Sequence, residues 1–219
     1  MRWKRGTIII LILNALLCAA LIASVAGYSH YANLLESQEA AKRWQGDTDV
    51  RFAQISCFRP VGKELSLNDI AQFRSSLETA LTDAAIDTES GVTMWVDAFS
   101  SKSELTVTGN RGSIEATAYE IGGQYFTFHP LKLVSGSYIS ENDLARDCVV
   151  LTRALAWSLF GAIDVTGMTV TIDGVPYLVS GVVDMEDDAA SLAAGSGGQC
   201  IYLHSDVRSE PADQVIDCY

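Results

Sequence analysis

The chain is short of basic residues. It holds 15 lysines and arginines against 27 aspartates and glutamates over 219 positions, a formal net charge of −12. Three of the basic residues lie in the first five positions, so residues 28–219 keep 12 basic against 27 acidic side chains, a net charge of about −15. Nucleic-acid binding needs clustered lysines and arginines that neutralise phosphates. We therefore expect no nucleic-acid partner.

The sequence also lacks the short motifs of common catalytic and metal sites. It contains no HExxH, CxxC, G-x-S-x-G or G-x-x-x-x-G-K-[ST] pattern. Its three histidines, His30, His129 and His204, are far apart and at no ligand spacing. The acidic run that begins at Asp184 lacks the alternation and the glycine of a calcium loop, so we interpret residues 184–198 as a solvated loop. We predict no catalytic, cofactor-binding or metal-binding residue and no enzymatic activity.

The first 27 residues contain no acidic side chain. Residues 7–26 are uncharged and would span roughly 30 Å as a helix, the thickness of a bilayer's hydrocarbon core. The basic residues before them favour a cytoplasmic N-terminus. We therefore predict a cytoplasmic tip and transmembrane helix over 1–27, in the cell membrane, with residues 28–219 outside the cytoplasm. A cleavable signal peptide is the alternative, because residues 24–26 have the small side chains of a cleavage site.

Residues 28–45 contain no glycine or proline and are rich in helix-forming residues. This composition predicts a helical stalk that continues the membrane helix out of the bilayer. A stalk of this kind would transmit movement of the membrane helix, and a proline at Leu34 would then uncouple the exported domain from the bilayer.

Residues 46–219 contain both strand-like and helix-like patterns. Alternating or continuous apolar runs predict strands at 50–58, 93–99, 104–109, 113–122, 147–152, 168–172, 175–183 and 200–204. Ser66 and Asp69 have the spacing of a capping box, and they precede an apolar stripe from Ile70 to Ala84 at helical spacing. We expect this stripe to pack in the core.

Turn and cap residues divide the second half of the domain. The tetrad 109–112 and the pair Asp173-Gly174 each predict a hairpin between flanking strands. Pro176 is expected at a strand start or edge because it lacks an amide donor. Residues 153–160 predict a short helix that ends at Gly161. The aromatic residues between 125 and 128 are expected to pack inside the domain.

Four cysteines lie in the predicted exported part: Cys57, Cys148, Cys200 and Cys218. Outside the cytoplasm an even number of thiols permits disulfides, and four thiols allow three pairings. A bond between Cys57 and Cys218 would join the two ends of the domain and could contribute about 4 kcal/mol by closing a long loop. Free buried thiols are the alternative, and the sequence does not choose between them.

Three consecutive blocks resemble a known family. Residues 123–144 read GQYFTFHPLKLVSGSYISENDL and are similar to a YF…LKLLEGR.F..EDL stretch in the periplasmic core domain of MacB-type ABC transporter permeases, in the FtsX-like superfamily. Residues 149–161, VVLTRALAWSLFG, resemble VVLSESLAKRLFG. Residues 164–183, DVTGMTVTIDGVPYLVSGVV, resemble DPVGKTIRINGVPFTVVGVV. The blocks follow one another in the family's order.

The resemblance implies a permease subunit with an extracytoplasmic α+β domain over 46–219, of two subdomains, that follows one membrane helix and a stalk. It implies a non-catalytic role that couples a cytoplasmic ABC ATPase to export or to extracytoplasmic partners. The remaining permease helices, a second permease copy and the lipid bilayer would be further partners. Because the chain ends before further membrane helices, we expect it to be truncated relative to the family. The alternative is a single-pass, membrane-anchored binding or sensing module of the same fold.

Overall fold

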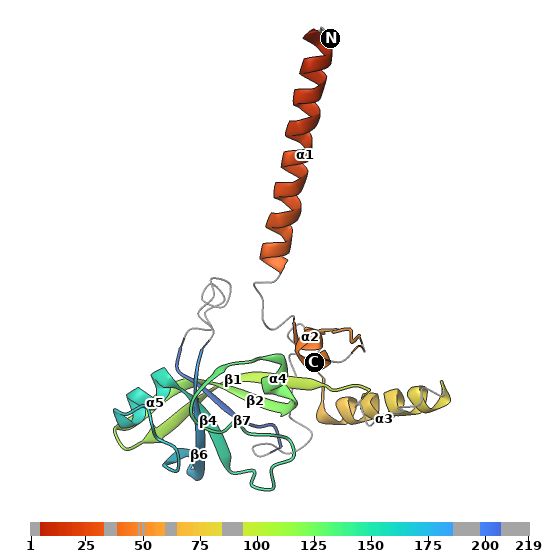
Figure 1. Ribbon diagram of the computed structural model, residues 1–219. Coiled ribbons are helices and arrows are strands. Elements are labelled where there is room, and N and C mark those ends of the chain that lie inside the picture. Colours follow the sequence, from red (N-terminus) through yellow and green to blue (C-terminus); the bar gives the residue numbers. More distant parts are fainter. Residues whose placement is uncertain are drawn as a thin grey trace.

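The longest helix of the protein projects away from all its other elements. In a computed structural model, residues 5–32, 39–47, 49, 51–59, 65–84, 94–185 and 198–206 are described. Helix α1 (Arg5–Ala32) projects from a domain of strands and shorter helices (Figure 1). Its segment Ile9–Ser29 has a mean hydropathy of 2.7 and is not buried inside the protein. Of the described helices, α1 alone is long and apolar enough to cross a membrane, which agrees with the prediction for residues 7–26.

The predicted stalk divides into two parts. Residues 28–32 continue α1, but Glu39 leaves the helical conformation, with φ −102° and ψ 15°. A separate short helix, α2 (Ala40–Gln45), follows it, and the Ala40 amide donates a 3.0 Å hydrogen bond to the side chain of Gln54. This acceptor replaces the carbonyl that a continuous helix would supply. The prediction of a single helix over 28–45 is therefore wrong at Glu39. Leu34 lies outside the described residues.

One sheet contains all seven strands of the described residues. They are β1 (Ala98–Gly109), β2 (Gly112–Gly123), β3 (Lys132–Gly136), β4 (Cys148–Thr152), β5 (Thr169–Ile172), β6 (Val175–Asp184) and β7 (Cys200–His204). The order is β3-β6-β4-β7-β2-β1-β5, and β5 also pairs with β6. Six strands thus form a ring, and β3 adds to β6 outside it. The β4–β6 and β2–β7 pairs are parallel and the other pairs are antiparallel.

The hairpin of β1 and β2 is longer than predicted. The sequence predicted separate strands at 93–99 and 104–109, but β1 is continuous and pairs with β2 from Ala98, opposite Gly123, to Gly109, opposite Gly112. The polar residues 100–103 stay in the strand because ladder hydrogen bonds come from the backbone, and alternate side chains such as Lys102 point to the exposed face. The division into two strands was wrong, and the turn at 109–112 is confirmed.

The hairpin of β5 and β6 has the predicted turn. Ile172 pairs with Val175 across Asp173 and Gly174, which have φ of 49° and 83°. Positive φ at both central residues is typical of a type I′ turn, which matches the twist of the flanking strands. Pro176 is the second residue of β6, so it lies at a strand start as expected.

Helix α5 (Arg153–Phe160) packs against the ring and completes its core. Thr152 Oγ1 accepts a hydrogen bond from the Leu155 amide, and Gly161 ends the helix with φ 72°. Leu155 and Leu159 are fully buried in one cluster with buried apolar side chains from the six strands of the ring, and Val134 of β3 packs against this cluster. Full burial of a leucine stabilises the fold by about 1.5–3 kcal/mol. The predicted helix and its terminal glycine are confirmed.

Helix α3 (Leu67–Asp83) starts as predicted but does not pack as predicted. The Ser66 hydroxyl accepts from the Asp69 amide, and the Asp69 carboxylate accepts from the Ser66 amide, so the capping box is complete. Of its apolar stripe, only Ile70 is buried, in a small cluster with Phe99. The prediction that the whole stripe lies in the core is wrong. Leu77 and Leu81 are only half-buried and Phe73 is 51% exposed, because α3 covers a pocket instead of packing closely on the sheet.

The predicted strand at 50–58 is also wrong over its described residues. Residues 51–59 contain a single bridge residue, Phe58, and no strand. The side chains of Ile55 and Phe58 are 83% and 78% exposed. Alternation alone does not make a strand, since strand preference depends on packing against neighbouring strands. The division into two subdomains stays a prediction, because residues 60–64 and 85–93 on both sides of α3 lie outside the described residues.

Gly136 offers a test of the packing of β3 on β6. It has φ 73°, and a Cβ there would overlap the Ser180 carbonyl oxygen, whereas Gly174 has φ 83° and open space around it. Gly174→Ala should lower the free energy of unfolding by about 1–2 kcal/mol, the cost of left-handed backbone. Gly136→Ala should lower it by about 1–3 kcal/mol more, because β6 must move. Chemical unfolding of the full chain in detergent measures both, and equal losses would contradict this packing.

Candidate functional site

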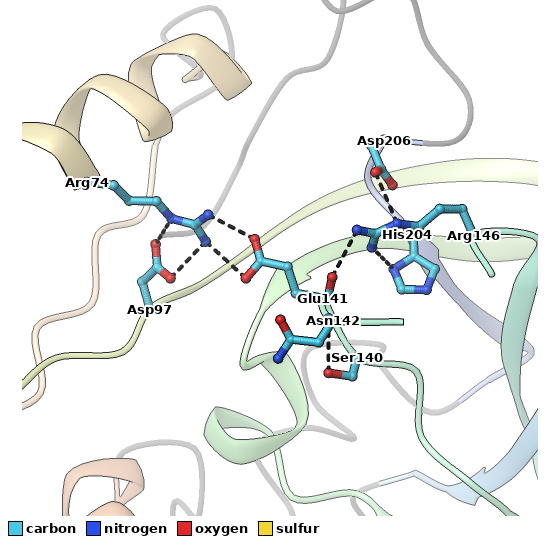
Figure 2. A network of polar contacts seen from close by, with 8 residues as sticks. All are labelled: Arg74, Asp97, Ser140, Glu141, Asn142, Arg146, His204 and Asp206. Atoms are coloured by element: carbon cyan, nitrogen blue, oxygen red, sulfur yellow. Dashed lines mark hydrogen bonds and ion pairs between the residues drawn. The ribbon is translucent and has the colours of Figure 1, made fainter. Parts of the chain in front are cut away.

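Arg74 of α3 joins three separate parts of the chain. Its Nε and Nη2 donate to the two carboxylate oxygens of Asp97, just before β1, at 2.7 and 2.9 Å. Its Nη1 donates to Glu141 Oε1, in the connection between β3 and β4, at 2.8 Å (Figure 2). Burial opposes the charge of the guanidinium, but the two carboxylates outweigh burial and raise the pKa of Arg74. Only arginine has the fork of donors that satisfies two carboxylates in this way.

Arg146 continues the network from the same connection to β7. Its Nη2 donates to the main-chain oxygen of Glu141 at 2.9 Å, and its Nη1 lies 3.2 Å from His204 Nδ1. Its Nε lies 3.5 Å from Asp206 Oδ2 (Figure 2). A guanidinium has donors and no acceptor, so His204 accepts at Nδ1 and carries its own proton at Nε2.

His204 is the buried member of this network. Its side chain is 3% exposed, and within the described residues Nε2 has no hydrogen-bond partner. Burial lowers the pKa of His204, and the positive charge of Arg146 lowers it further, against opposing effects of Asp206 and Asp143. The imidazole is therefore neutral at pH 7. A neutral ring is what the contact with Arg146 requires.

A pocket of about 400 Å³ lies between α3 and the end of the sheet, beside this network. Its apolar lining includes Ile70 and Phe99, and its polar lining includes Arg74, Glu141 and His204. The Arg74 guanidinium carbon lies 5.6 Å from the centre of the Phe99 ring, within cation–π distance. The sheet thus forms one side of the pocket, and α3 forms the opposite side.

A second junction attaches α2 to the sheet domain. Arg43 donates from Nε and Nη2 to the main-chain oxygen of Thr127, at 3.2 and 3.1 Å, and from Nη2 to that of Phe128, at 3.0 Å. Both acceptors belong to the short helix α4 (Tyr125–Phe128). A cation at carbonyls that lack helical partners is a favourable arrangement. This junction connects the chain after α1 to the sheet domain.

Aromatic side chains of α4 pack inside the domain, as the sequence predicted. Tyr125 is buried and stacks on His129 with 4.5 Å between ring centroids. Phe126 stacks on Tyr138 at 4.7 Å and meets Tyr202 of β7 edge-on at 5.7 Å. Burial, aided by the charge of Arg43, lowers the pKa of His129 to about 4. The aromatic packing and the α2 junction thus share one face of the domain.

The histidines and acids singled out from the sequence do not come together. His129 and His204 belong to the two different junctions, and nothing of the His30 side chain is described. Asp184 pairs with Arg153 at 2.5 Å, while residues 186–188 lie outside the described residues. Within the described part of the chain, no group of three histidine, cysteine, aspartate or glutamate side chains has the arrangement of a metal site.

No pattern in the sequence marks the arginines that organise the site. Arg74, Arg146 and Arg43 belong to no motif, and their partners are 23 to 85 residues away or are main-chain oxygens. The one local signal is Arg74, a charged residue one turn after the buried Ile70 on the same helix face. Such a signal indicates that Arg74 lies beside the buried face of the helix, but it does not indicate which residues Arg74 binds.

Residues 8–210 match the family described as MacB-like periplasmic core domain. The chain belongs to this family. The match includes most of α1 and all seven strands of the sheet.

Curated relatives and a solved structure agree with this membership. The macrolide export ATP-binding/permease protein MacB of Aggregatibacter actinomycetemcomitans is 35% identical over 85 residues, which is 38% of this chain and 13% of that protein. MacB of Neisseria gonorrhoeae is 33% identical over 86 residues, with the same coverage. The extracellular domain of the noncanonic ABC-type transporter YknZ from Gram-positive bacteria aligns with a TM-score of 0.51 and 16% identity, over 74% of this chain and 79% of that one. That structure shows the fold, and the chain spans about an eighth of the curated relatives' length.

The half-buried His129 of this MacB-like domain predicts acid sensitivity. The folded protein holds the pKa of His129 at about 4, below the ordinary value of 6.5, so the unfolded chain binds the proton first. The free energy of unfolding should therefore fall as the pH drops below 6.5, by up to about 3 kcal/mol at pH 4. Denaturation of the full chain at several pH values measures this loss. His129→Gln should remove this part of the pH dependence. An equal fall in the free energy of unfolding with decreasing pH in the wild type and the variant would contradict the prediction.

The bond between Cys57 and Cys218 stays a prediction for the MacB-like domain. Cys57 is exposed and available to a partner, and Cys218 lies outside the described residues. In protein matured outside the cytoplasm, non-reducing peptide mapping should find one peptide that joins the two cysteines. Cys57→Ser and Cys218→Ser should lower the midpoint of thermal unfolding equally, because either removes the same loop closure. Alkylation of both thiols without prior reduction would contradict the bond.

Proposed function

We propose that this chain is a non-catalytic extracytoplasmic domain of an ABC transporter permease, anchored in the cell membrane by α1. The observation that carries the proposal is the single family match over residues 8–210, which includes the membrane-length helix and the sheet domain in one unit. The orientation follows from the basic residues before α1, which favour a cytoplasmic N-terminus. The acidic sheet domain then lies on the outer side.

The α2 junction is the proposed route of movement between the membrane and the sheet domain. Six residues, 33–38, separate Ala32 of α1 from Glu39, so α2 cannot lie far from the end of the membrane helix. Arg43 attaches α2 to the carbonyls of Thr127 and Phe128. Hydrogen bonds from a charged donor contribute about 1.5–3 kcal/mol each. A displacement of α1 would thus be passed through α2 to α4 and the aromatic side chains below it.

The chemistry of the polar network supports a structural role. Arg74 and Arg146 are bound by carboxylates and main-chain oxygens, and His204 is held neutral. Catalytic acids and bases have pKa values near the working pH and lie within reach of a substrate. The raised pKa of Arg74 keeps its guanidinium protonated, so Arg74 does not act as an acid or a base. Arg74 joins α3 to the sheet domain, and Arg146 joins the connection between β3 and β4 to β7.

The proposed partners follow from the permease assignment. A cytoplasmic ABC ATPase would drive the membrane helices, and further permease helices or a second permease copy would complete the transporter. The sheet domain would pass the resulting movement to extracytoplasmic partners or to the exported substrate. In the alternative, the chain is a single-pass binding or sensing module, and the pocket between α3 and the sheet is the observation that favours it.

Purification from native membranes tests the proposal against the alternative. The full chain with a C-terminal tag, solubilised in mild detergent, should co-purify with an ABC ATPase identified by mass spectrometry. A matched chain with residues 1–27 replaced by a cleavable signal peptide should lose that ATPase, because α1 is the proposed link. Arg43→Ala should keep the ATPase but lose ATP-dependent changes in amide exchange within the sheet domain. Equal recovery of the ATPase with and without α1, or none with either, would contradict the proposal.

A further inference from the structure

We propose that the contacts from His204 through Arg146 and Glu141 to Arg74 form an acid-sensitive latch, which holds α3 over the pocket and releases it when His204 takes up a proton. The latch is defined by these four residues, which Figure 2 shows as one connected path from β7 to α3. The inference does not depend on the proposed function, since it concerns the described residues alone.

The first step concerns the atom that receives the proton. Arg146 Nη1 lies 3.2 Å from His204 Nδ1 and can only donate, so Nδ1 must offer a lone pair. His204 Nε2 already carries the ring's proton. An incoming proton can therefore bind only at Nδ1, which is the atom that accepts from Arg146. Protonation replaces an attractive contact by two positive charges at hydrogen-bond distance, so Arg146 must move away.

The charges around His204 agree with this step. On the 137–147 connection, Arg146 faces it as a cation and Asp143 as an anion, and Asp206 follows it on its own segment. On the neighbouring β4, Cys148 comes one residue before Val149, which pairs with Leu203, and burial raises the pKa of its thiol, so the thiol is neutral. On β2, its register partner is the apolar Ile121.

Helix α3 adds one charge of each sign across the pocket, Arg74 and Glu78. In the closed arrangement, burial and Arg146 together outweigh the nearby anions and lower the pKa of His204. An open arrangement, with the ring hydrated, returns the pKa toward 6.5. The open arrangement therefore binds the proton more strongly, and acid favours it as the pH falls below 6.5.

The second step carries the change to Glu141. Arg146 Nη2 holds the main-chain oxygen of Glu141 at 2.9 Å, so displacement of Arg146 frees the backbone at that residue. The carboxylate of the same residue holds Arg74 Nη1 at 2.8 Å. Release of the backbone therefore loosens the carboxylate that α3 depends on. One residue connects both halves of the latch, through its main chain on one side and its side chain on the other.

The third step concerns the other contacts of α3 with the described residues on this side. Ile70 is its one buried side chain, and the second partner of Arg74 is Asp97, just before β1. When Glu141 leaves, α3 and Asp97 stay joined, while the 137–147 connection separates from them. Glu141 and Ile70 both line the pocket, so this separation widens it.

Hydrogen–deuterium exchange of the full chain in detergent tests the latch. Exchange is compared at about pH 7.5 and about pH 5.5, after correction for the intrinsic rate at each pH. Over this interval an open-state pKa near 6.5 increases the open population by up to about tenfold. Peptides from α3 and from residues 137–147 should exchange faster at the lower pH by up to that factor, while peptides from β4 and α5 report whether the core stays folded.

Two variants separate the steps, and a third is the control. His204→Asn keeps an acceptor for Arg146 but does not titrate, so exchange in α3 should become independent of pH. Glu141→Gln keeps the main-chain contact with Arg146 and weakens the contact with Arg74. In this variant α3 should exchange fast at both pH values, while residues 137–147 stay pH-dependent. Arg153→Gln removes an arginine–carboxylate pair outside the latch and should behave like the wild type.

Three results would each overturn the latch. The first is equal corrected exchange of α3 at the two pH values in the wild type. The second is an unchanged pH dependence of α3 in His204→Asn. The third is an unchanged pH dependence of α3 in Glu141→Gln. If His204→Asn does not fold, as its core peptides would show, the wild type and Glu141→Gln still decide the question, because the Glu141 side chain is 38% exposed and belongs to none of the buried core clusters.

Discussion

Closure of the sheet through β5 is the constraint on which the rest of the structure depends. This four-residue strand pairs with β1 on one side and with β6 on the other. Without both pairings the sheet would be open, and the buried leucines of α5 would lose the strand side chains that surround them. Within the ring, β7 pairs with β4 and β2, which places His204 at the end of the sheet where the pocket lies.

Local patterns in the sequence were sufficient where a structural element depends on its own residues. The turn at Asp173 and Gly174, the capping box of Ser66 and Asp69, and the end of α5 at Gly161 each follow from residues within a few positions of one another. The same holds for α1, whose length and composition identify it directly. The family resemblance of residues 123–183 supplied the α+β class and is confirmed by the match over 8–210.

Local patterns failed where the outcome depends on a distant partner. Residues 51–59 alternate like a strand, and α3 has an apolar stripe, yet Ile55 and Phe58 remain exposed and only Ile70 of the stripe is buried. In both cases amphipathicity predicts a face to be covered without specifying what covers it. The site was missed for the same reason, because Arg74 and Arg146 act through partners that only the fold brings near.

Buried apolar contacts and arginine contacts hold different parts of this domain, so we expect these parts to differ in mobility. The ring and α5 are held by fully buried apolar side chains, which respond little to salt or pH. Within the described residues, Arg43 attaches α2 to main-chain carbonyls and Arg74 attaches α3 to carboxylates, and both arginines are only partly buried. Partly exposed ionic contacts are weakened by salt and by changes of charge, and parts of a structure with few buried contacts open first. The ring is rigid, and α2 and α3 are attached to it by arginine side chains. Either helix can therefore change its position while the core of the ring stays intact.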